Sequence, residues 1–215
     1  VYGSISGFGQ DGPYRDRPGF DQIAQGMGGL MSVTGEPGQG PMRVGIPIAD
    51  LTAGIFCAQG ILLALLERER SGKGQWVQTS LLQAQVFMLD FQAARYTMAG
   101  EVPGQAGNDH PTSIPTGVFK TSDGYINIAC SGQHMWVRLK ELMGDPAFDN
   151  PDFDKPAGRS KHRKAVNALI NAQTKKASSD AWIAKLNDAG IPCGEINTID
   201  KVFANPQVQH LGIAT

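Results

Sequence analysis

The side chain best placed to do chemistry in this sequence is the carboxylate of Asp50. It follows the strand-like stretch Ile46-Pro47-Ile48 and directly precedes an apolar segment that predicts a helix over residues 51–70. Between the end of a strand and the start of a helix, a carboxylate lies where ligands bind in α/β folds. The helix N–H groups and dipole are expected to lower its pKa and keep it ionised, as a nucleophile requires. An N-cap role is the commoner explanation of this position, because Asp is favoured there on structural grounds alone.

A glycine pattern near the start, GFGQDG at residues 7–12, fits the G-x-G-x-x-G fingerprint of dinucleotide-binding sites. That fingerprint needs a strand before the glycines and a helix directly after them, because the helix N-terminus binds the pyrophosphate. A β-branched pattern over residues 1–5 predicts the strand, which we expect to be buried. Pro13 and Pro18 exclude the helix, so we interpret the glycines as a sharp turn at the end of a strand.

The composition is that of an ordinary globular chain. Its 215 residues suffice for one large or two modest domains, and a net charge of −1 gives no reason to expect nucleic-acid binding. The longest apolar run, residues 51–66, is too short and too mixed for a membrane span, so we expect a buried helix and no membrane partner. The three cysteines lie far apart and lack metal-ligand spacing, which predicts buried or free thiols in a cytoplasmic protein without a metal site.

The elements that position Asp50 are predicted from hydrophobic spacing and capping residues. A helix with Asp21 in its first turn is expected over residues 20–31. Its three internal glycines weaken it and suggest that another backbone or a ligand comes very close. The other expected elements of this half are a strand-like segment over residues 42–48, a strand over 76–79 and a helix over 81–99, which Ser80 caps and Gly100 ends.

A break in composition over residues 101–116, rich in Gly and Pro, predicts a linker or functional loop. We therefore expect a larger α/β domain over residues 1–100, this linker, and a smaller α+β domain over residues 117–215. The smaller domain should open with a β-hairpin, because Ser122-Asp123-Gly124 has turn chemistry between two strand patterns. Its expected elements are strands over 117–121 and 125–129 and helices over 134–143, 160–175 and 179–189, the last capped by Ser179.

Several stretches together resemble one family, the class III CoA-transferases, which include formyl-CoA transferase and carnitine CoA-transferase (the CaiB/BaiF group). They are GFGQDGPY, RPGFDQIAQGMGGLMSVTG, RVGIPIADLTAG and LLALLERERSGKGQWVQTSLL, followed by GNDHP, PTGVFKT, DGY and NPQV. Their order and spacing are more specific than any one of them, and they cover most of the chain. The resemblance implies the end of a Rossmann-like large domain, a linker and a smaller α+β domain.

The resemblance also implies that Asp50 is a catalytic nucleophile. In this family the aspartate attacks an acyl-CoA thioester to give a mixed anhydride and CoA thiolate, and exchange with an acceptor carboxylic acid follows. This chemistry needs an ionised carboxylate shielded from water and N–H donors aimed at the developing oxyanion. The implied substrates are an acyl-CoA and a carboxylic acid, so coenzyme A is part of the substrate and no cofactor is permanently bound.

A sister group with the same scaffold, the α-methylacyl-CoA racemases, is the main alternative. Its members move a proton with His and Asp, and their Gly-His-Asp run aligns with Gly19-Phe20-Asp21. Phe20 cannot exchange a proton, which disfavours racemisation. A chain that only binds or dimerises is the alternative outside catalysis.

An active-site loop is expected over residues 104–111, in the place of the family's mobile loop. Gly107, Asn108 and His110 are its candidate substrate contacts, although packing beside Pro111 explains His110 at least as well. The loop lacks the longer glycine run of formyl-CoA transferase, which disfavours formyl and oxalyl substrates.

Arg15 and Arg17 are candidate ligands for CoA phosphates or for a substrate carboxylate, with surface ion pairing as the equal alternative. In the family a Rossmann-like half supplies most of the CoA contacts. That half precedes Val1 here, so we expect this chain to be a piece of a longer protein. Family members also form interlocked homodimers, which we expect of the full-length protein.

Overall fold

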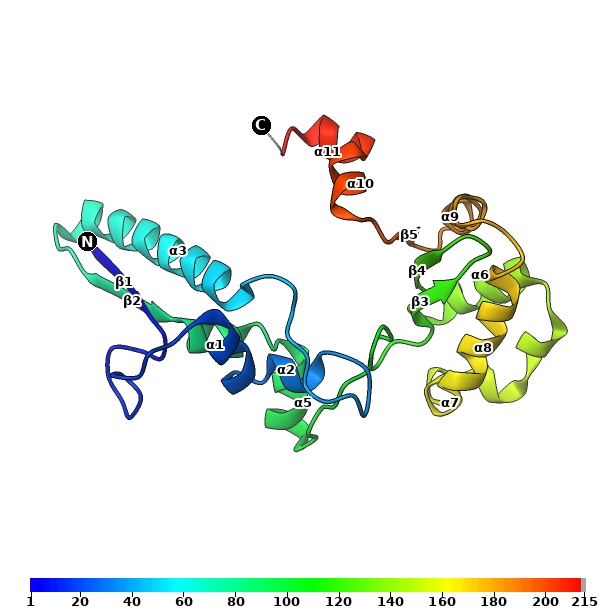
Figure 1. The fold of residues 1–215 in the computed structure, drawn as a ribbon, viewed down its shortest axis with the longest axis horizontal. Helices are drawn as coiled ribbons and strands as arrows, with labels where there is room; N and C mark the ends of the chain where they lie inside the picture. The colour runs from blue at the N-terminus through cyan, green and yellow to red at the C-terminus, as the bar shows by residue number, and fades with distance from the viewer. Residues whose placement is uncertain (214–215) are drawn as a thin grey trace. The chain divides into compact units, whose positions relative to one another are not determined.

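The computed structural model describes residues 1–213 and divides the chain into two compact units, Val1–Gly107 and Asn108–Thr215 (Figure 1). The boundary between the units falls inside the segment 101–116 that was predicted to be a linker. Helices and small sheets alternate along the chain, which confirms the predicted α/β class. Ala214 and Thr215 lie outside the described residues.

A parallel two-stranded ribbon forms the base of the first unit. Strands β1 (Tyr2–Ser6) and β2 (Trp76–Ser80) pair with Tyr2 opposite Trp76, which confirms both predicted strands. The expectation that β1 is buried is wrong, because Tyr2 and Ile5 are exposed.

Helix α3 (Ile48–Ser71) runs along this ribbon (Figure 1). Glycines allow the close packing: a Cβ atom on Gly60 would lie 2.6 Å from a methyl group of Val77, and one on Gly3 would lie 2.6 Å from Ile61. The helix ends at Ser71, one residue after the predicted end at residue 70, and its C-cap Gly72 has a φ of +69° that suits glycine.

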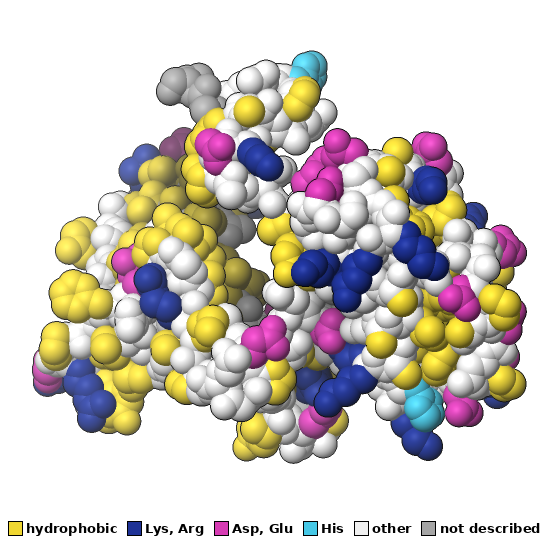
Figure 2. Space-filling model, turned by 45° about the vertical axis from the view of Figure 1, so that its right-hand side comes forward, with side chains coloured by type: hydrophobic (Ala, Val, Ile, Leu, Met, Phe, Trp, Pro, Cys, Tyr) yellow, Lys and Arg dark blue, Asp and Glu magenta, His cyan; other side chains and the backbone are white. Residues whose placement is uncertain are grey.

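The outer face of α3 is apolar and exposed, so the prediction of a buried helix is wrong for the described chain. Leu62, Leu63 and Leu66 are 63%, 61% and 66% exposed, and Figure 2 shows many hydrophobic side chains on the surface of the first unit. Among residues 1–213, α3 is the one helix long and apolar enough to cross a membrane, with a mean hydropathy of 1.8. Core helices of soluble proteins meet the same criterion, so this is weak evidence for a membrane span.

The helix expected over residues 20–31 is divided into α1 (Asp21–Met27) and α2 (Leu30–Val33). The break falls at Gly29, whose φ of +85° is left-handed. The glycines were expected to admit another backbone or a ligand, but at Gly28 the close neighbour is the side chain of Gln85, with which an added Cβ atom would clash.

The helix expected over residues 81–99 is likewise divided, into α4 (Leu81–Phe87) and α5 (Phe91–Ala99). Between them Asp90, the N-cap of α5, has a positive φ of +48°, which a continuous helix cannot contain. The predicted caps are confirmed: Ser80 Oγ accepts the N–H of Gln83 at 3.1 Å, and Gly100 ends α5.

The second unit contains a three-stranded antiparallel sheet in the order β3-β4-β5. Strands β3 (Thr116–Lys120) and β4 (Tyr125–Ala129) form the predicted hairpin. The third strand, β5 (Cys193–Glu195), pairs with β4 and was not predicted, because three residues are too few to carry a strand pattern.

Helices pack with this sheet around one apolar core. Phe119, Ile126 and Ile128 from the sheet share that core with Trp136 and Ile170 from the helices. The elements that contribute to it are α6 (Gln133–Met143), α8 (Arg163–Thr174) and α9 (Ser179–Asp188), with 3-10 turns η1 (Pro146–Asp149) and η2 (Pro151–Phe153). Helices α7 (Pro156–Lys161), α10 (Ile199–Ala204) and α11 (Pro206–Leu211) complete the unit and have no residue in that core.

The helix predictions for the second unit are confirmed in part. The helix expected over residues 160–175 is interrupted at His162, which ends α7 and begins α8. The N-cap of α9 is Ser178 instead of Ser179, and its hydroxyl accepts the N–H of Ala181. Helices α10 and α11 were not predicted, because their six-residue lengths are too short to show a helical period.

Candidate active site

Asp50 lies in the first turn of α3, as its third residue. Pro47 is the N-cap, so the N-cap role considered for Asp50 is wrong. The predicted strand before it is also wrong, because residues 42–47 have no regular structure. The carboxylate nevertheless lies at the positive end of a 24-residue helix, and no cation among the described residues forms an ion pair with it.

The start of α3 is fixed by Asp21 from the first turn of α1. The Asp21 Oδ1 atom accepts the backbone N–H of Ala49 at 2.9 Å, so a buried carboxylate on one helix caps the other. Arg43 Nη2 lies 3.9 Å from Asp21 Oδ2 and partly balances its charge. The residue next to Asp50 is therefore held in place by a side chain 28 positions earlier.

Gln25, fully buried on α1, holds the irregular segment that leads into α3. Its Nε2 atom donates to Asp21 Oδ2 at 2.7 Å and to the carbonyl of Ile46 at 3.2 Å. Its Oε1 atom accepts the N–H of Val44 at 2.9 Å. The N–H of Val44 and the carbonyl of Ile46, which a strand would have paired in a sheet, are thus satisfied by one amide side chain.

The pKa of Asp50 is raised from its ordinary value, first by partial desolvation and second by the negative charge of Asp21. The expectation that the helix terminus lowers this pKa is therefore wrong. The expectation of a carboxylate shielded from water is not met within this chain either, because Asp50 is exposed. Asp21 thus both orders the backbone beside Asp50 and repels a second negative charge there.

Few amide donors at the start of α3 are left for a ligand. The N–H of Ile48 donates to the carbonyl of Ile46 at 2.9 Å, and the N–H of Ala49 is taken by Asp21. The N–H of Asp50 itself has no acceptor among the described residues. It is the donor of this turn that could meet an oxyanion beside the carboxylate.

Phe20 is brought close to the start of α3, whereas Arg15 and Arg17 interact locally. Phe20 is 77% exposed and precedes Asp21, so Phe20 and Asp50 flank the bond between Asp21 and Ala49. Arg15 Nε lies 3.2 Å from Asp16 Oδ2 in an exposed ion pair.

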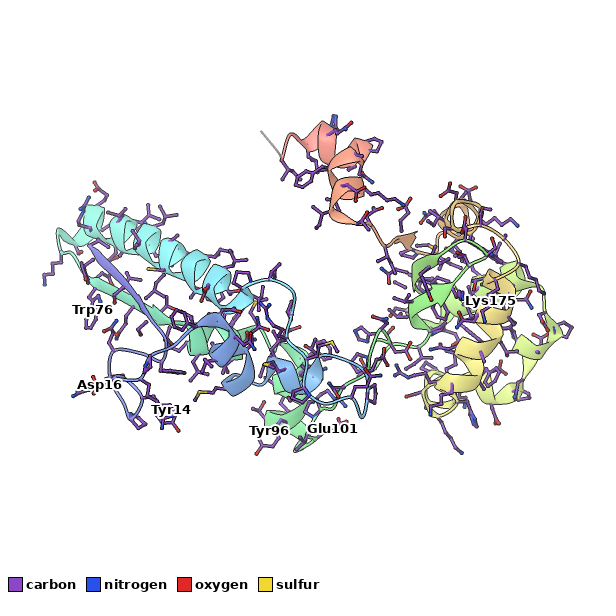
Figure 3. All side chains as sticks on the ribbon, in the orientation of Figure 1. Tyr14, Asp16, Trp76, Tyr96, Glu101 and Lys175 are labelled. Atoms are coloured by element: carbon purple, nitrogen blue, oxygen red, sulfur yellow. The ribbon has the colours of Figure 1, made fainter. Side chains whose placement is uncertain are left out.

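The guanidinium of Arg17 lies 3.8 Å from the ring centre of Tyr14. Figure 3 places Tyr14 and Asp16 in the loop that follows β1. Neither arginine forms a hydrogen bond or an ion pair with Asp50.

The predicted active-site loop is anchored at several points. In the first unit, the N–H of Gly107 donates to the carbonyl of Gly35 at 3.0 Å. In the second unit, Arg163 of α8 donates to the carbonyls of His110 and Pro111, both at 2.7 Å. The Nδ1 atom of His110 accepts the N–H of Ser113 at 3.0 Å.

Sequence reasoning missed Asp21 and Gln25 as residues that position the site. Their spacing of four residues places both on one face of α1, and a carboxylate with an amide at that spacing was the available signal. Their partners in residues 44–49 lie in a segment that was predicted to be a strand, so the contacts were not foreseen.

Comparison with known proteins identifies the chain. Residues 1–215 match the model of CoA-transferase family III, so the chain belongs to that family. It is 37% identical to the succinate–glutarate CoA-transferase of Agrobacterium fabrum over 214 residues. This match covers 99% of this chain and 54% of that protein. It is 34% identical to the succinyl-CoA–D-citramalate CoA-transferase of Chloroflexus aurantiacus over 204 residues. This match covers 94% of this chain and 51% of that protein.

A solved structure has the same fold. The crystal structure of a CaiB/BaiF family protein from Brucella suis matches with a TM-score of 0.86 and 38% sequence identity, over 99% of this chain and 57% of that chain. The chain spans about half the length of the curated relatives it matches.

Proposed function

We propose that the protein containing this chain transfers CoA from an acyl-CoA to a carboxylic acid, with Asp50 as the nucleophile. The proposal rests chiefly on one observation: an exposed carboxylate with no ion-pair partner among residues 1–213 lies in the first turn of α3, and Asp21 fixes the backbone beside it. Membership in CoA-transferase family III supports the same reaction.

In the proposed first step a carboxylate oxygen of Asp50 attacks the thioester carbon. The C–S bond breaks, CoA leaves as the thiolate, and the acyl group is held as a mixed anhydride on Asp50. In the proposed later steps the CoA thiolate attacks the Asp50 carbonyl carbon and displaces the donor carboxylate, which leaves a CoA thioester on Asp50. The acceptor carboxylate displaces the thiolate to form a second mixed anhydride, and the thiolate then attacks the acceptor acyl carbon, so that the new acyl-CoA leaves and the Asp50 carboxylate is regenerated. No net proton or electron is gained or lost. The N–H of Asp50 is the proposed donor to the oxyanion that forms at the thioester carbon.

The raised pKa of Asp50 fits this role. Nucleophilicity increases with basicity, so a carboxylate that is less stabilised as an anion attacks more readily, provided that it is ionised at the working pH. Because the first unit leaves Asp50 exposed, we expect exclusion of water to require further polypeptide.

We propose short dicarboxylic acids and their CoA esters as substrates, since the relatives are named for succinate, glutarate and citramalate. Arg15 and Arg17 are proposed ligands for the phosphates of CoA. Phe20, together with Gly107, Asn108 and His110 from the loop, is a proposed substrate contact. We propose that no cofactor is permanently bound. We also propose that the chain divides into a large domain over residues 1–100, a loop over residues 101–116 and a small domain over residues 117–215.

The test is a search for the covalent intermediate in the full-length protein. After incubation with succinyl-CoA and rapid acid quenching, we expect a succinyl or CoA adduct on the peptide that carries Asp50. The Asp50→Ala variant should lose the adduct and lower the rate of CoA exchange by roughly 10³-fold or more.

The matched control is Asp16→Asn, which removes an exposed carboxylate from the loop after β1. This variant should keep the adduct on Asp50. Exchange activity of Asp50→Ala within about tenfold of the original protein would refute the nucleophile assignment.

We also propose that the full-length protein is a cytoplasmic, interlocked homodimer without a nucleic-acid or membrane partner. Sedimentation analysis tests the oligomeric state, and a monomeric full-length enzyme with full activity would contradict it.

A further inference from the structure

The second unit contains a cavity of about 520 Å³ on which several polar groups converge. It lies where the strand ends of the hairpin meet the starts of α6 and α7. His110, Thr112, Ser113, Ile114, Thr116, Ala129, Ser131, Gly132, Pro156 and Arg159 line it.

The one residue of permanent charge in the lining is Arg159, which is 1% exposed. Its Nε atom donates to the carbonyl of Ile114 at 3.2 Å, and its Nη1 atom donates to the carbonyl of Phe153 at 2.8 Å and that of Asp154 at 3.1 Å. Nη1 also lies 3.2 Å from Gln133 Oε1. These contacts use Nε and Nη1, and Nη2 has no acceptor among the described residues.

The positive charge of Arg159 has no anionic partner in the part of the chain that the structure describes. The acidic groups that act on its pKa are the buried thiol of Cys130 first and then the carboxylate of Asp154, which lies 4.0 Å from Lys140 Nζ. Burial lowers the pKa of the Arg159 guanidinium from its ordinary value. A buried cation held by neutral carbonyls is costly unless an anion approaches it.

The start of α6 faces the same cavity. Gly132, its N-cap, lines the cavity and provides no side chain to bond the first-turn N–H groups of this 11-residue helix. Such N–H groups and the helix dipole attract an anion. Ser131 precedes the helix, and the hydroxyls of Ser113 and Thr116, 3.2 Å apart, lie across the lining. Arg159 and α6 therefore present two independent features that favour an anion.

The charge balance indicates which anion fits. No Asp or Glu is among the lining residues, and Arg159 is the single one of permanent charge. Its one positive charge balances the one negative charge of a carboxylate. A phosphate dianion would require a second cation. We propose that this cavity binds the carboxylate of a small organic acid, held by the Arg159 guanidinium, the N-terminus of α6 and the surrounding hydroxyls. The inference concerns the second unit alone and does not depend on the chemistry of Asp50.

The experiment is a titration of the 215-residue chain with succinate and glutarate, followed by calorimetry and by amide shifts in ¹⁵N NMR. We expect saturable binding of one acid per chain, with the largest shifts at Ser131 and Gly132. The neutral diester dimethyl succinate should not bind. Inorganic phosphate should bind at least about tenfold more weakly than succinate.

Two variants locate the site. Ser131→Glu places a negative charge at an exposed position of the lining without breaking a buried contact, and should weaken succinate binding by about tenfold or more. The matched control Ser122→Glu, in the hairpin turn of the same unit, should not change the affinity. Arg159→Lys keeps the charge but loses the planar fork and should also weaken binding.

Arg159 also donates hydrogen bonds to three backbone carbonyls, so its replacement could unfold the second unit. The binding result for Arg159→Lys therefore counts only if thermal unfolding of this variant remains cooperative. Binding should be unchanged in Asp50→Ala, which separates this site from the proposed nucleophile. Absence of saturable binding, equal affinity in Ser131→Glu, shifts confined to residues outside the lining, or tighter binding of phosphate than of succinate would each overturn the inference.

Discussion

The carboxylate of Asp21 bonds the backbone N–H of Ala49 at 2.9 Å, one residue before Asp50. Two aspartates from separate helices thus meet at the start of α3, one structural and the other exposed. The same Asp21 carboxylate therefore holds the backbone at Ala49 and places a negative charge beside Asp50.

Replacing Asp21 by Asn tests the electrostatic part of this link. Asn keeps an oxygen acceptor for Ala49 but removes the negative charge that raises the pKa of Asp50. We therefore expect the pKa of Asp50 to fall in Asp21→Asn, measured by ¹³C NMR titration of its carboxyl group. Asp16→Asn is the control and should leave the titration of Asp50 unchanged, whereas an unchanged pKa in Asp21→Asn would contradict the link.

The pH dependence of the free energy of unfolding should show how much the ionised Asp50 carboxylate destabilises the folded chain. Its pKa is higher in the folded chain than in the unfolded chain, so the folded state binds the proton more tightly. The ionised group therefore lowers the free energy of unfolding above the folded pKa, and this penalty disappears below the unfolded pKa.

We expect Asp50→Asn to unfold at higher urea concentration than the original chain at pH 7. The difference between the two chains should vanish near pH 3, below the ordinary Asp pKa of 3.8. A difference of equal size at both values of pH would show that charge is not its cause.

Arg163 should control the order of the loop around His110. Arg163→Met removes two bonds to backbone carbonyls, at His110 and Pro111, and should destabilise the second unit by about 1–2 kcal/mol. Hydrogen exchange at residues 109–113 should accelerate at the same time. Lys164→Met, exposed on the same helix, is the control, and unaltered exchange in Arg163→Met would mean that other contacts order the loop.

The thiols should differ in reactivity. Burial raises the pKa of Cys130 to about 12 and that of Cys193 to about 11, so both are almost fully protonated at pH 8. We expect iodoacetamide to label Cys193, which is half-buried, before Cys130, with the urea-unfolded chain as the reference for full labelling. Labelling of Cys130 at the rate found in the unfolded chain would contradict its burial.

The sequence was sufficient to predict those elements that short-range chemistry decides. Ser80 and Gly100 cap their helices as expected, and the turn around Asp123 joins two strands because its residues favour a hairpin. Asp123 Oδ1 also accepts the N–H of Ser179 at 2.8 Å, a long-range contact that no local pattern contains.

The errors arise where distant residues decide the outcome. Residues 42–47 have the composition of a strand, yet Gln25 bonds their backbone groups and no neighbouring strand does. The pKa of Asp50 was predicted to fall because only the helix was considered, and the buried charge of Asp21 could not be placed beside it from the sequence. The Arg159 cavity depends on residues from 110 to 159 and had no signal in any single motif.

The bonds on either side of Asn108 have a mechanical consequence. Gln105 and Gly107 are tied to residues of the first unit, and Asp109, His110 and Pro111 to α8 of the second. Between these anchors, no hydrogen bond of Asn108 is found within residues 1–213. Rotation about the φ and ψ bonds of Asn108 is therefore not opposed by a hydrogen bond of its own within the described residues, and a proline at position 108 would fix its φ.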